Sequence, residues 1–369
     1  HPAAAPAGSV GQGPLTSSCT VAGGHTSCDI WAKIGAVSVH DTASTTKSIP
    51  VWNFVPTSGT TASGASALLI GQVGQPIDIT LHNTLPDSVG LAVPQADGFY
   101  GDTTGIAQGA SKTYTFTPTR AGTYVYEAAL TPAGDRQVAM GLAGALVVRP
   151  AAGSTTAYDL AQASYDDEAM MVYSDVDENF AADPMNFNMR DYNPQYHLIN
   201  GVSYPDGAPI ITDAGRTLVL HFANVSQLDK SPTLLGTRMT EFAKSARSIP
   251  TTMSVTGRWI APGDTMDASI VLPAGQHRYA IYSNPASLSN GTQWLDGVNS
   301  PALGGGITLI QSGGTGTVAP TGPSVFKMAA AGQPGGVGRP LTVAMTLDTT
   351  NRGGGDIAQV EYWVDTLPG

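Results

Sequence analysis

The segment 122–148, GTYVYEAALTPAGDRQVAMGLAGALVV, decides the fold of this chain of 369 residues. It begins with GTYVYE, which is rich in Tyr and Val, and it ends with the almost entirely apolar run GLAGALVV. β-Branched and aromatic residues favour strands, and the residues between the two runs include Pro and Gly, which favour a turn or loop. The segment therefore predicts two strands joined by a loop.

Composition and charge restrict the class of protein and its partners. Gly contributes 44 residues and Pro 26, whereas charged residues make up only 12% of the chain, a balance that favours short strands and turns. The 17 basic and 28 acidic residues give a net charge of −11, and Lys and Arg form no cluster. We therefore predict an all-β protein that binds no nucleic acid and does not insert into a membrane.

Further strand-like runs surround the deciding segment. SIPVWNFVP (48–56) and KTYTFTP (112–118) are short runs, rich in β-branched and aromatic residues and closed by Pro. Together they predict a Greek-key β-sandwich over residues 34–150.

The same residues resemble the first domain of a multicopper oxidase, a family with cupredoxin folds. In that family the segment looks like G-T-Y-W-Y-H-x-H, then a loop, then Q…G-L-x-G-A-L-I-V. The positions that match in this chain are Gly122, Thr123, Tyr124, Tyr126, Gln137, Gly141, Leu142, Gly144, Ala145, Leu146 and Val147.

The resemblance implies copper, but the sequence lacks the expected ligands. Glu127 and Ala129 replace the two histidines of the His-x-His, and a carboxylate next to a methyl group cannot stand in for two imidazole donors. A second His-x-His is expected shortly after Asn83, yet the stretch 87–98, DSVGLAVPQADG, contains no histidine. We therefore expect no copper cofactor and no oxidase activity.

Residues 158–310 carry the pattern of a second cupredoxin-like sandwich. The run 187–210, FNMRDYNPQYHLINGVSYPDGAPI, resembles the start of the second domain in bacterial multicopper-oxidase-like proteins. TLVLHFANVS (217–226) and WIAPGDTMDASIVLP (259–273) continue the strand pattern. Lys230 stands where the family often has a histidine, and the C-terminal His-Cys-His segment of a type 1 copper site is absent from the sequence.

The two ends of the chain differ from its centre. Residues 311–323 predict a flexible linker, and residues 324–369 resemble the first half of a bacterial immunoglobulin-like domain. Three strands are marginal for independent folding, so we expect either a polypeptide that continues past Gly369 or a second chain that supplies strands. Residues 1–33 are predicted to be an extension, whose Pro-rich start resembles the product of signal cleavage or a remnant of expression.

Two cysteines indicate the compartment. Cys19 and Cys28 enclose a Gly-rich loop, and we expect them to form a disulfide in a secreted or cell-surface protein. The alternative is a pair of free thiols in a cytosolic protein.

His1, His82 and His221 are the remaining candidates for metal ligation. None of the seven histidines lies within two residues of another, so the sequence contains no local metal-binding pair. We interpret His82 and His221 as structural histidines at equivalent places in the two sandwiches. His1, if it is the mature N-terminus, can chelate Cu(II) through its amino group and its imidazole, the alternative being a mobile arm.

The acidic stretch at residues 166–178 is a further candidate for metal binding, in this case of calcium. Its carboxylates do not follow the spacing of an EF-hand, so we interpret the stretch as a solvated strand edge and turn and not as a calcium site.

These observations predict a non-catalytic extracellular structural protein that associates with itself or with other cell-surface proteins. A strand donated by the N-terminal arm of one subunit to the open C-terminal unit of the next would build a filament. The alternative is a secreted copper-dependent oxidase with an atypical ligand set. A carbohydrate-binding module also fits the sandwich folds, but the sequence shows no row of aromatic residues for it.

Overall fold

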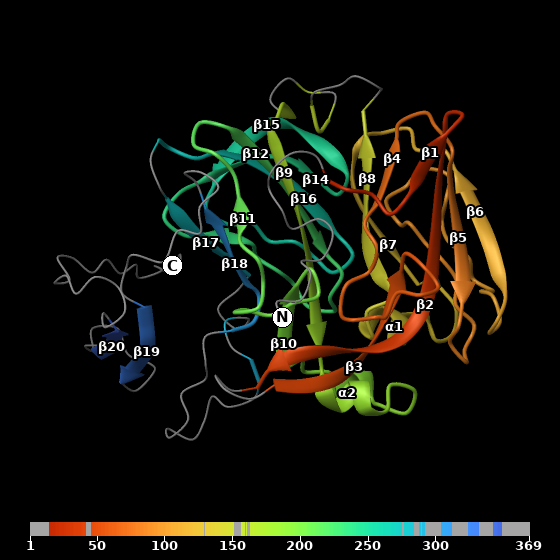
Figure 1. The fold of residues 1–369 in the computed structure, drawn as a ribbon, viewed down its shortest axis with the longest axis horizontal. Coiled ribbons are helices and arrows are strands. Elements are labelled where there is room, and N and C mark those ends of the chain that lie inside the picture. The colour runs from red at the N-terminus through yellow and green to blue at the C-terminus, as the bar shows by residue number, and fades with distance from the viewer. Residues whose placement is uncertain are drawn as a thin grey trace. The chain divides into compact units, whose positions relative to one another are not determined.

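Strands account for nearly all the regular structure in the computed structural model (Figure 1), and the prediction of an all-β fold is confirmed. One compact unit comprises His1–Leu295 and Pro301–Gly314, and a second comprises Asp296–Ser300 and Thr315–Gly369. The structure describes residues 15–41, 46–128, 130–150, 156–158, 160, 163–274, 277–283, 288, 290–291, 304–311, 324–331 and 342–348.

The first β-sandwich consists of two sheets. One has the strand order β1-β2-β5-β6, with β3 paired to β2, and the other has the order β4-β8-β7. The element bounds are β1 (Thr20–Ala22), β2 (His25–His40), β3 (Thr46–Val55), β4 (Leu69–Gln72), β5 (Ile77–Asn83), β6 (Ser111–Phe116), β7 (Gly122–Glu127), α1 (Gly134–Ala139) and β8 (Ala143–Arg149).

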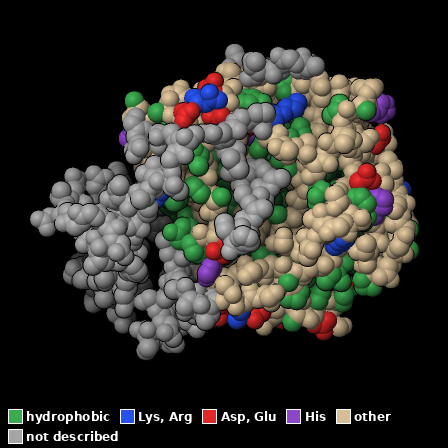
Figure 2. Space-filling model, in the orientation of Figure 1, with side chains coloured by type: hydrophobic (Ala, Val, Ile, Leu, Met, Phe, Trp, Pro, Cys, Tyr) green, Lys and Arg blue, Asp and Glu red, His purple; other side chains and the backbone are tan. Residues whose placement is uncertain are grey.

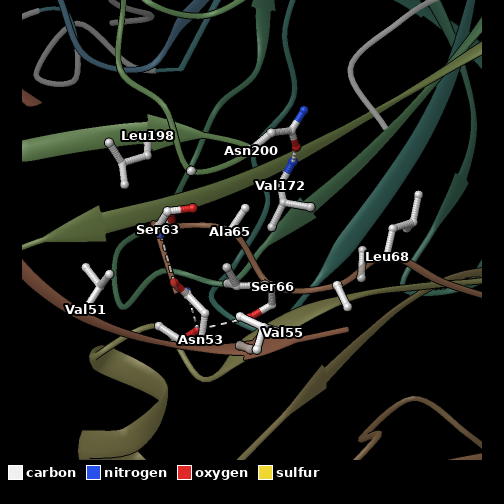
Figure 3. A pocket seen from close by; sticks show the side chains of 18 of the residues that line it. Val51, Asn53, Val55, Ser63, Ala65, Ser66, Leu68, Val172, Leu198 and Asn200 are labelled. Atoms are coloured by element: carbon white, nitrogen blue, oxygen red, sulfur yellow. Dashed lines mark hydrogen bonds between the residues drawn. The ribbon is translucent and has the colours of Figure 1, made fainter. Parts of the chain in front are cut away.

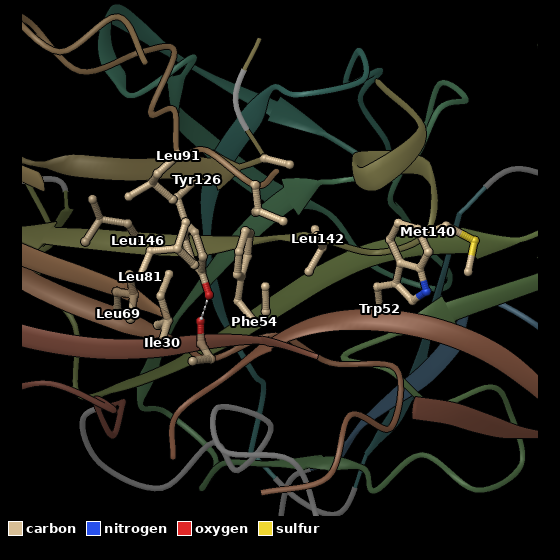
Figure 4. Close-up of a cluster of buried hydrophobic side chains, with 14 of the residues drawn as sticks. Ile30, Trp52, Phe54, Leu69, Leu81, Leu91, Tyr126, Met140, Leu142 and Leu146 are labelled. Carbon is tan, nitrogen blue, oxygen red and sulfur yellow. Dashed lines mark hydrogen bonds between the residues drawn. The ribbon is translucent and has the colours of Figure 1, made fainter. Parts of the chain in front are cut away.

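The deciding segment forms the centre of this sandwich. Strands β7 and β8 pair antiparallel, and Tyr126 faces Gly144 across the pair. A Cβ atom at Gly144 would lie 2.6 Å from the Tyr126 ring, so only glycine leaves room for the tyrosine. The Tyr126 hydroxyl donates to the carbonyl of Ala67 in the apolar core, where its ring lies beside Phe54 (Figure 4). The motif residues thus fix how the two sheets pack.

The second β-sandwich also has two sheets. Their strand orders are β10-β9-β12-β16-β14-β15 and β11-β18-β17-β13. The element bounds are β9 (Asp167–Val176), α2 (Glu178–Ala182), the 3-10 helix η2 (Met189–Asp191), β10 (Tyr196–Ile199), β11 (Ile210–Ile211), β12 (Thr217–Asn224), β13 (Thr233–Leu234), β14 (Met239–Lys244), β15 (Arg247–Val255), β16 (Thr265–Val271), β17 (Arg278–Tyr282) and β18 (Ile307–Gln311).

The two sandwiches pack through a shared apolar cluster, which places their four sheets in successive layers (Figure 1). We call it the interface cluster. It joins the outer face of β7 and β8 to β9 and β12, so that each of these strands is covered on both faces. Its buried members are Leu15, Leu68, Val125, Ala143, Ala145, Val147, Met170, Ala223 and Val225.

The N-terminal region requires a correction. Residues 20–33 do not form an extension, because β2 runs unbroken across residue 33 and pairs in parallel with β5. Its buried positions before that boundary are Thr26, Cys28, Ile30 and Ala32, and because only Ile30 is a large apolar residue, the alternation is weak in the sequence. Cys19 and Cys28 form the expected disulfide, which fastens the start of the chain to this strand. The other predicted domain boundaries stay predictions.

The second compact unit contains β19 (Ser324–Ala331) and β20 (Thr342–Asp348), which pair antiparallel. The third strand-like run predicted for this unit lies outside the described residues, and its immunoglobulin-like fold stays a prediction. Among the helices that the structure describes, none has the length and apolar character needed to cross a bilayer.

Candidate functional site

The two segments in which the family resemblance places copper ligands lie side by side. Glu127, the last residue of β7, exchanges two backbone hydrogen bonds with Ala92, at N···O distances of 2.9 and 3.0 Å. Ala92 belongs to the histidine-free stretch 87–98, so the chain brings both ligand segments together as the resemblance implies. Ala129 lies outside the described residues. The scaffold of the site is therefore present, and its chemistry depends on the side chains that remain.

Glu127 is a half-buried acid without a charged partner among the residues that the structure describes. Burial and, to a smaller extent, the nearby carboxylate of Asp135 raise the pKa of its carboxyl group from 4.5 to about 7. No ion pair joins Glu127 to any residue in the described part of the chain. A carboxyl group in this environment is protonated in a large share of molecules at neutral pH, and it differs in charge, donor atom and geometry from an imidazole ligand.

Replacing Glu127 with glutamine is expected to stabilise the protein at alkaline pH. The folded state favours the protonated acid, so ionisation of Glu127 costs stability as the pH rises from 4.5 to about 7, and the cost is constant above that. We expect Glu127→Gln to raise the free energy of unfolding by about 1–3 kcal/mol at pH 9 and to leave it unchanged at pH 4.5. Urea denaturation at both pH values tests this, and a loss of stability at pH 9 would show that the carboxylate is favourable.

His82 lies on the outer face of β5 with both ring nitrogens engaged. Its ring stacks on Trp31 at 4.2 Å, its Nε2 lies 3.0 Å from Asp29 Oδ1, and its Nδ1 accepts from the hydroxyl of Ser111 at 2.7 Å. A metal ion would have to displace one of these contacts. The arrangement supports the interpretation of His82 as a structural histidine.

His221 is buried between the two sandwiches and is held by two carboxylates. Its Nδ1 lies 2.6 Å from Asp267 Oδ1, and its Nε2 lies 3.2 Å from Glu168 Oε2. Burial by itself would lower the pKa of the imidazole, but the two carboxylates outweigh it and raise the pKa from 6.5 to about 9. His221 is therefore a cation at neutral pH, and a protonated imidazole has no lone pair for a metal.

A second cation completes this arrangement, which we call the interface charge network. It comprises Arg149, Glu168, His221 and Asp267. Arg149 comes from β8 of the first sandwich and makes two hydrogen bonds to Glu168 on β9 of the second. Burial would raise the pKa of Glu168, but His221 and Arg149 lower it from 4.5 to about 2. Two cations thus balance two anions in a region from which water is largely excluded.

Hydroxyl groups satisfy the remaining acceptors of Asp267. The side chain of Thr123, a residue of the deciding segment, donates to Asp267 Oδ1 at 2.6 Å, and the Tyr158 hydroxyl donates to Asp267 Oδ2. Thr123 lies on β7 of the first sandwich, so the motif position serves the interface. A buried charged group is tolerable only with such complete hydrogen bonding.

The prediction that His82 and His221 occupy equivalent places is wrong, because their positions differ by two residues when the two sandwiches are aligned. The true counterparts are Asn83 and Asn224, since each donates from its side-chain amide to the carbonyl four residues later and accepts from the backbone N–H two residues later. His82 precedes its asparagine by one residue and His221 by three. Both side chains lie on the outer face of their own sandwich, but they do not occupy equivalent positions along the strand.

The acidic stretch is not a solvated edge, and this expectation is corrected. Its residues Asp167–Val176 form β9, an interior strand of a six-stranded sheet, in which Asp167, Glu168 and Asp175 are buried and engaged, whereas Asp166 and Glu178 flank the strand and are exposed. Asp167 pairs with Arg216, and Asp177 accepts from the first backbone N–H groups of α2. Arg216 lies 49 residues from Asp167, and for this reason the local pattern concealed that ion pair.

Lys230 takes part in a second buried charged cluster that the sequence did not reveal. Its Nζ lies 2.5 Å from Asp175 Oδ1, and His197 Nδ1 lies 2.6 Å from the same oxygen. The side chain of Lys230 is 2% exposed and that of Asp175 is fully buried. The sequence resemblance implies that the family often has a histidine at this place, where this chain has a lysine that forms a buried ion pair.

The remaining histidines also make structural contacts. His25 and His40 lie within 3.4 Å of Asp78 and Asp206, respectively, and His277 packs on Tyr279. His1 lies outside the described residues. In the part of the chain that the structure describes, no group of three His, Cys, Asp or Glu side chains is arranged to hold a metal ion.

Comparisons with known proteins agree with this geometry. Residues 66–153 match the family model of multicopper oxidase, and they include both segments where ligands were expected. No curated protein sequence matches the chain.

Solved copper proteins share the fold. A blue copper oxidase from Nitrosomonas europaea is 17% identical, with 78% of this chain and 85% of that chain covered and a TM-score of 0.63. The multicopper oxidase mgLAC is 17% identical, with 80% and 89% covered and a TM-score of 0.62. A copper nitrite reductase from Nitrosomonas europaea is 16% identical, with 78% and 94% covered and a TM-score of 0.57. The predicted cupredoxin-like fold is confirmed.

Proposed function

We propose that this chain, which has the fold of a multicopper oxidase, is a non-catalytic structural or interaction protein of the cell exterior. The observation that carries the proposal is the interface charge network, in which His221 serves as a buried cation. A fold shared with oxidases does not imply their chemistry, because chemistry depends on the residues of the site. Glu127 and Lys230 support the same proposal, since the sequence resemblance implies a histidine ligand at the first position and often a histidine at the second.

An extracellular location is supported by the Cys19–Cys28 disulfide. Such bonds persist in oxidising compartments and are rare in the cytosol. On the face shown in Figure 2, charged side chains are scattered among apolar and polar ones without a basic patch, which favours protein partners over nucleic acid.

Self-assembly by strand donation remains the specific form of the proposal. Within the described residues of the second unit, β19 and β20 pair only with each other, and a two-stranded sheet is marginally stable by itself. A strand from another subunit would add backbone hydrogen bonds at the open edge of this sheet. Such a head-to-tail contact can repeat without closing, and repetition gives a filament.

The structure limits which residues can be donated. Leu15 belongs to the interface cluster, and its backbone N–H donates to Glu168 at 3.0 Å, so the chain is held in place from this residue onward. The donated segment must therefore lie within residues 1–14.

Metal content and particle size together test the proposal. We expect the full chain from its natural source to hold well below one copper ion per chain by mass spectrometry and to form regular assemblies by light scattering and electron microscopy. Deleting residues 1–13 should leave the melting temperature unchanged and abolish the assemblies. A longer deletion, of residues 1–30, would not test the arm alone, because it also removes β1 and part of β2.

The outcomes separate the two parts of the proposal. Copper at one ion or more per chain would overturn the non-catalytic function and favour the alternative, a copper oxidase with an atypical ligand set. Assemblies that persist after deletion of residues 1–13 would overturn strand donation alone.

A further inference from the structure

A cavity of about 190 Å³ lies where the first sandwich meets the second (Figure 3). Val51 and Ala65 of the first sandwich and Val172 and Leu198 of the second contribute to its largely apolar wall. Ser63, which is exposed, also lines it, so the cavity reaches the surface beside this residue.

Two asparagines in the wall hold the backbone through their side-chain amides. Asn53 accepts from the N–H of Gly64 at 2.8 Å and donates to the carbonyl of Gly141 at 3.2 Å. Asn200 on the opposite side accepts from the N–H of Val172 at 2.8 Å and donates to the carbonyl of Met170 at the same distance. These amides shape the cavity, and the oxygen and nitrogen of each already have a backbone partner.

Asp175 is different, because one of its carboxylate oxygens has no hydrogen-bond donor among the described residues. Asp175 lines the cavity, and its side chain is fully buried. Its Oδ1 is hydrogen-bonded to both Lys230 and His197. Oδ2 is equally buried and accepts no hydrogen bond from the residues that the structure describes. A buried carboxylate oxygen without a donor is costly, so this atom favours a ligand that brings one.

We propose that this cavity binds a small neutral molecule whose single hydroxyl group donates to Asp175 Oδ2. A neutral ligand is favoured because Lys230 already balances the charge of Asp175, and a second cation in the same buried region would be unpaired. The size fits as well, since an apolar cavity of about 150 Å³ binds benzene. A six-membered ring with one hydroxyl group would fill the apolar part and satisfy the polar end.

Cyclohexanol and cyclohexanone form a matched pair of probes. They share size and shape, but only the alcohol can donate, whereas the ketone would turn an oxygen toward the carboxylate. We expect the full chain to bind cyclohexanol with a Kd of about 1 mM or lower in calorimetry, and cyclohexanone at least about tenfold more weakly. Cyclohexanol should also raise the melting temperature in proportion to its occupancy.

Three variants test where the ligand binds and which group of the protein selects it. Ala65→Leu places a larger side chain in the cavity and should abolish cyclohexanol binding, whereas Ser58→Leu, at an exposed position on the same loop that does not line the cavity, should leave it unchanged. Asp175→Asn should reverse the preference toward the ketone, because Lys230 and His197 keep the amide oxygen and turn its NH₂ group to the cavity.

Three results would overturn the proposal. Equal affinity for the alcohol and the ketone would show that Asp175 does not select the ligand. Binding that survives in Ala65→Leu would place the ligand elsewhere. Absence of binding up to 20-fold above the expected Kd, about 20 mM, would mean that the cavity holds only solvent.

Discussion

Replacing His221 with alanine is expected to lower the free energy of unfolding by about 3–5 kcal/mol at neutral pH. The variant removes one cation from the interface charge network and leaves Asp267 buried without an opposite charge. Arg149 would still pair with Glu168, so the loss concerns mainly the Asp267 side of the network. Because the network joins both sandwiches, we expect their unfolding to remain a single transition at a lower urea concentration.

The pH dependence provides the decisive check on His221. Its pKa in the folded state is raised from 6.5 to about 9, so its contribution to stability is complete below pH 6.5 and is lost as the pH rises to 9. The difference between the two proteins should therefore shrink by up to about 3 kcal/mol over this range. Glu168, whose pKa is lowered to about 2, contributes fully above pH 4.5, and its contribution is lost toward pH 2.

His82→Ala is the matched control for this experiment. His82 lies on the outer surface, with 27% of its side chain exposed, and its pair with Asp29 is worth at most about 1 kcal/mol. A His221 variant that loses no more than this control, or whose deficit does not change with pH, would show that the imidazole is not a buried cation.

Replacing Lys230 with methionine should also cost about 3–5 kcal/mol. The methionine fills most of the volume of the lysine, so the loss would come from Asp175, which keeps only His197 as a partner. Urea denaturation at pH 7 measures the effect. A loss below about 1 kcal/mol would contradict the buried ion pair.

A double variant separates charge from packing at this place. Asp175→Asn combined with Lys230→Met removes both charges and keeps the hydrogen bond to His197. The double variant should recover most of the stability that Lys230→Met loses, since a buried pair replaced by neutral groups is often tolerated. If the double variant is as unstable as the single one, packing of the lysine stem and not its charge stabilises the fold.

Much of the fold was predictable from the sequence because its signals are local. The Tyr-rich strand ending at Glu127 and the apolar run that contains Gly144 already contain the facing pair on which the first core depends. The start of β2 was missed for an equally local reason, since Ile30 is the one large apolar residue among its inward positions before residue 33, the others being Thr26, Cys28 and Ala32. A small or polar residue that is buried by its neighbours has no signature of its own in the sequence.

The charged clusters were not predictable, because they depend on contacts between distant residues. Asp175 lies 55 residues from Lys230, and Glu168 lies 53 residues from His221. In the sequence, the carboxylates look like a solvated acidic run and the two cations stand alone. Only the pairing of β9 with β12, and the packing of the first sandwich against them, brings opposite charges together.

The interface charge network restricts how this protein can change in evolution. Each substitution of Arg149, Glu168, His221 or Asp267 leaves an opposite charge unpaired in the interior, so single replacements by neutral residues should be eliminated by selection. Replacements that remove a cation and its anion together avoid this barrier. Homologues with this interface should therefore differ at these positions in pairs, and such covariation would distinguish them from homologues whose sandwiches meet through apolar contacts alone.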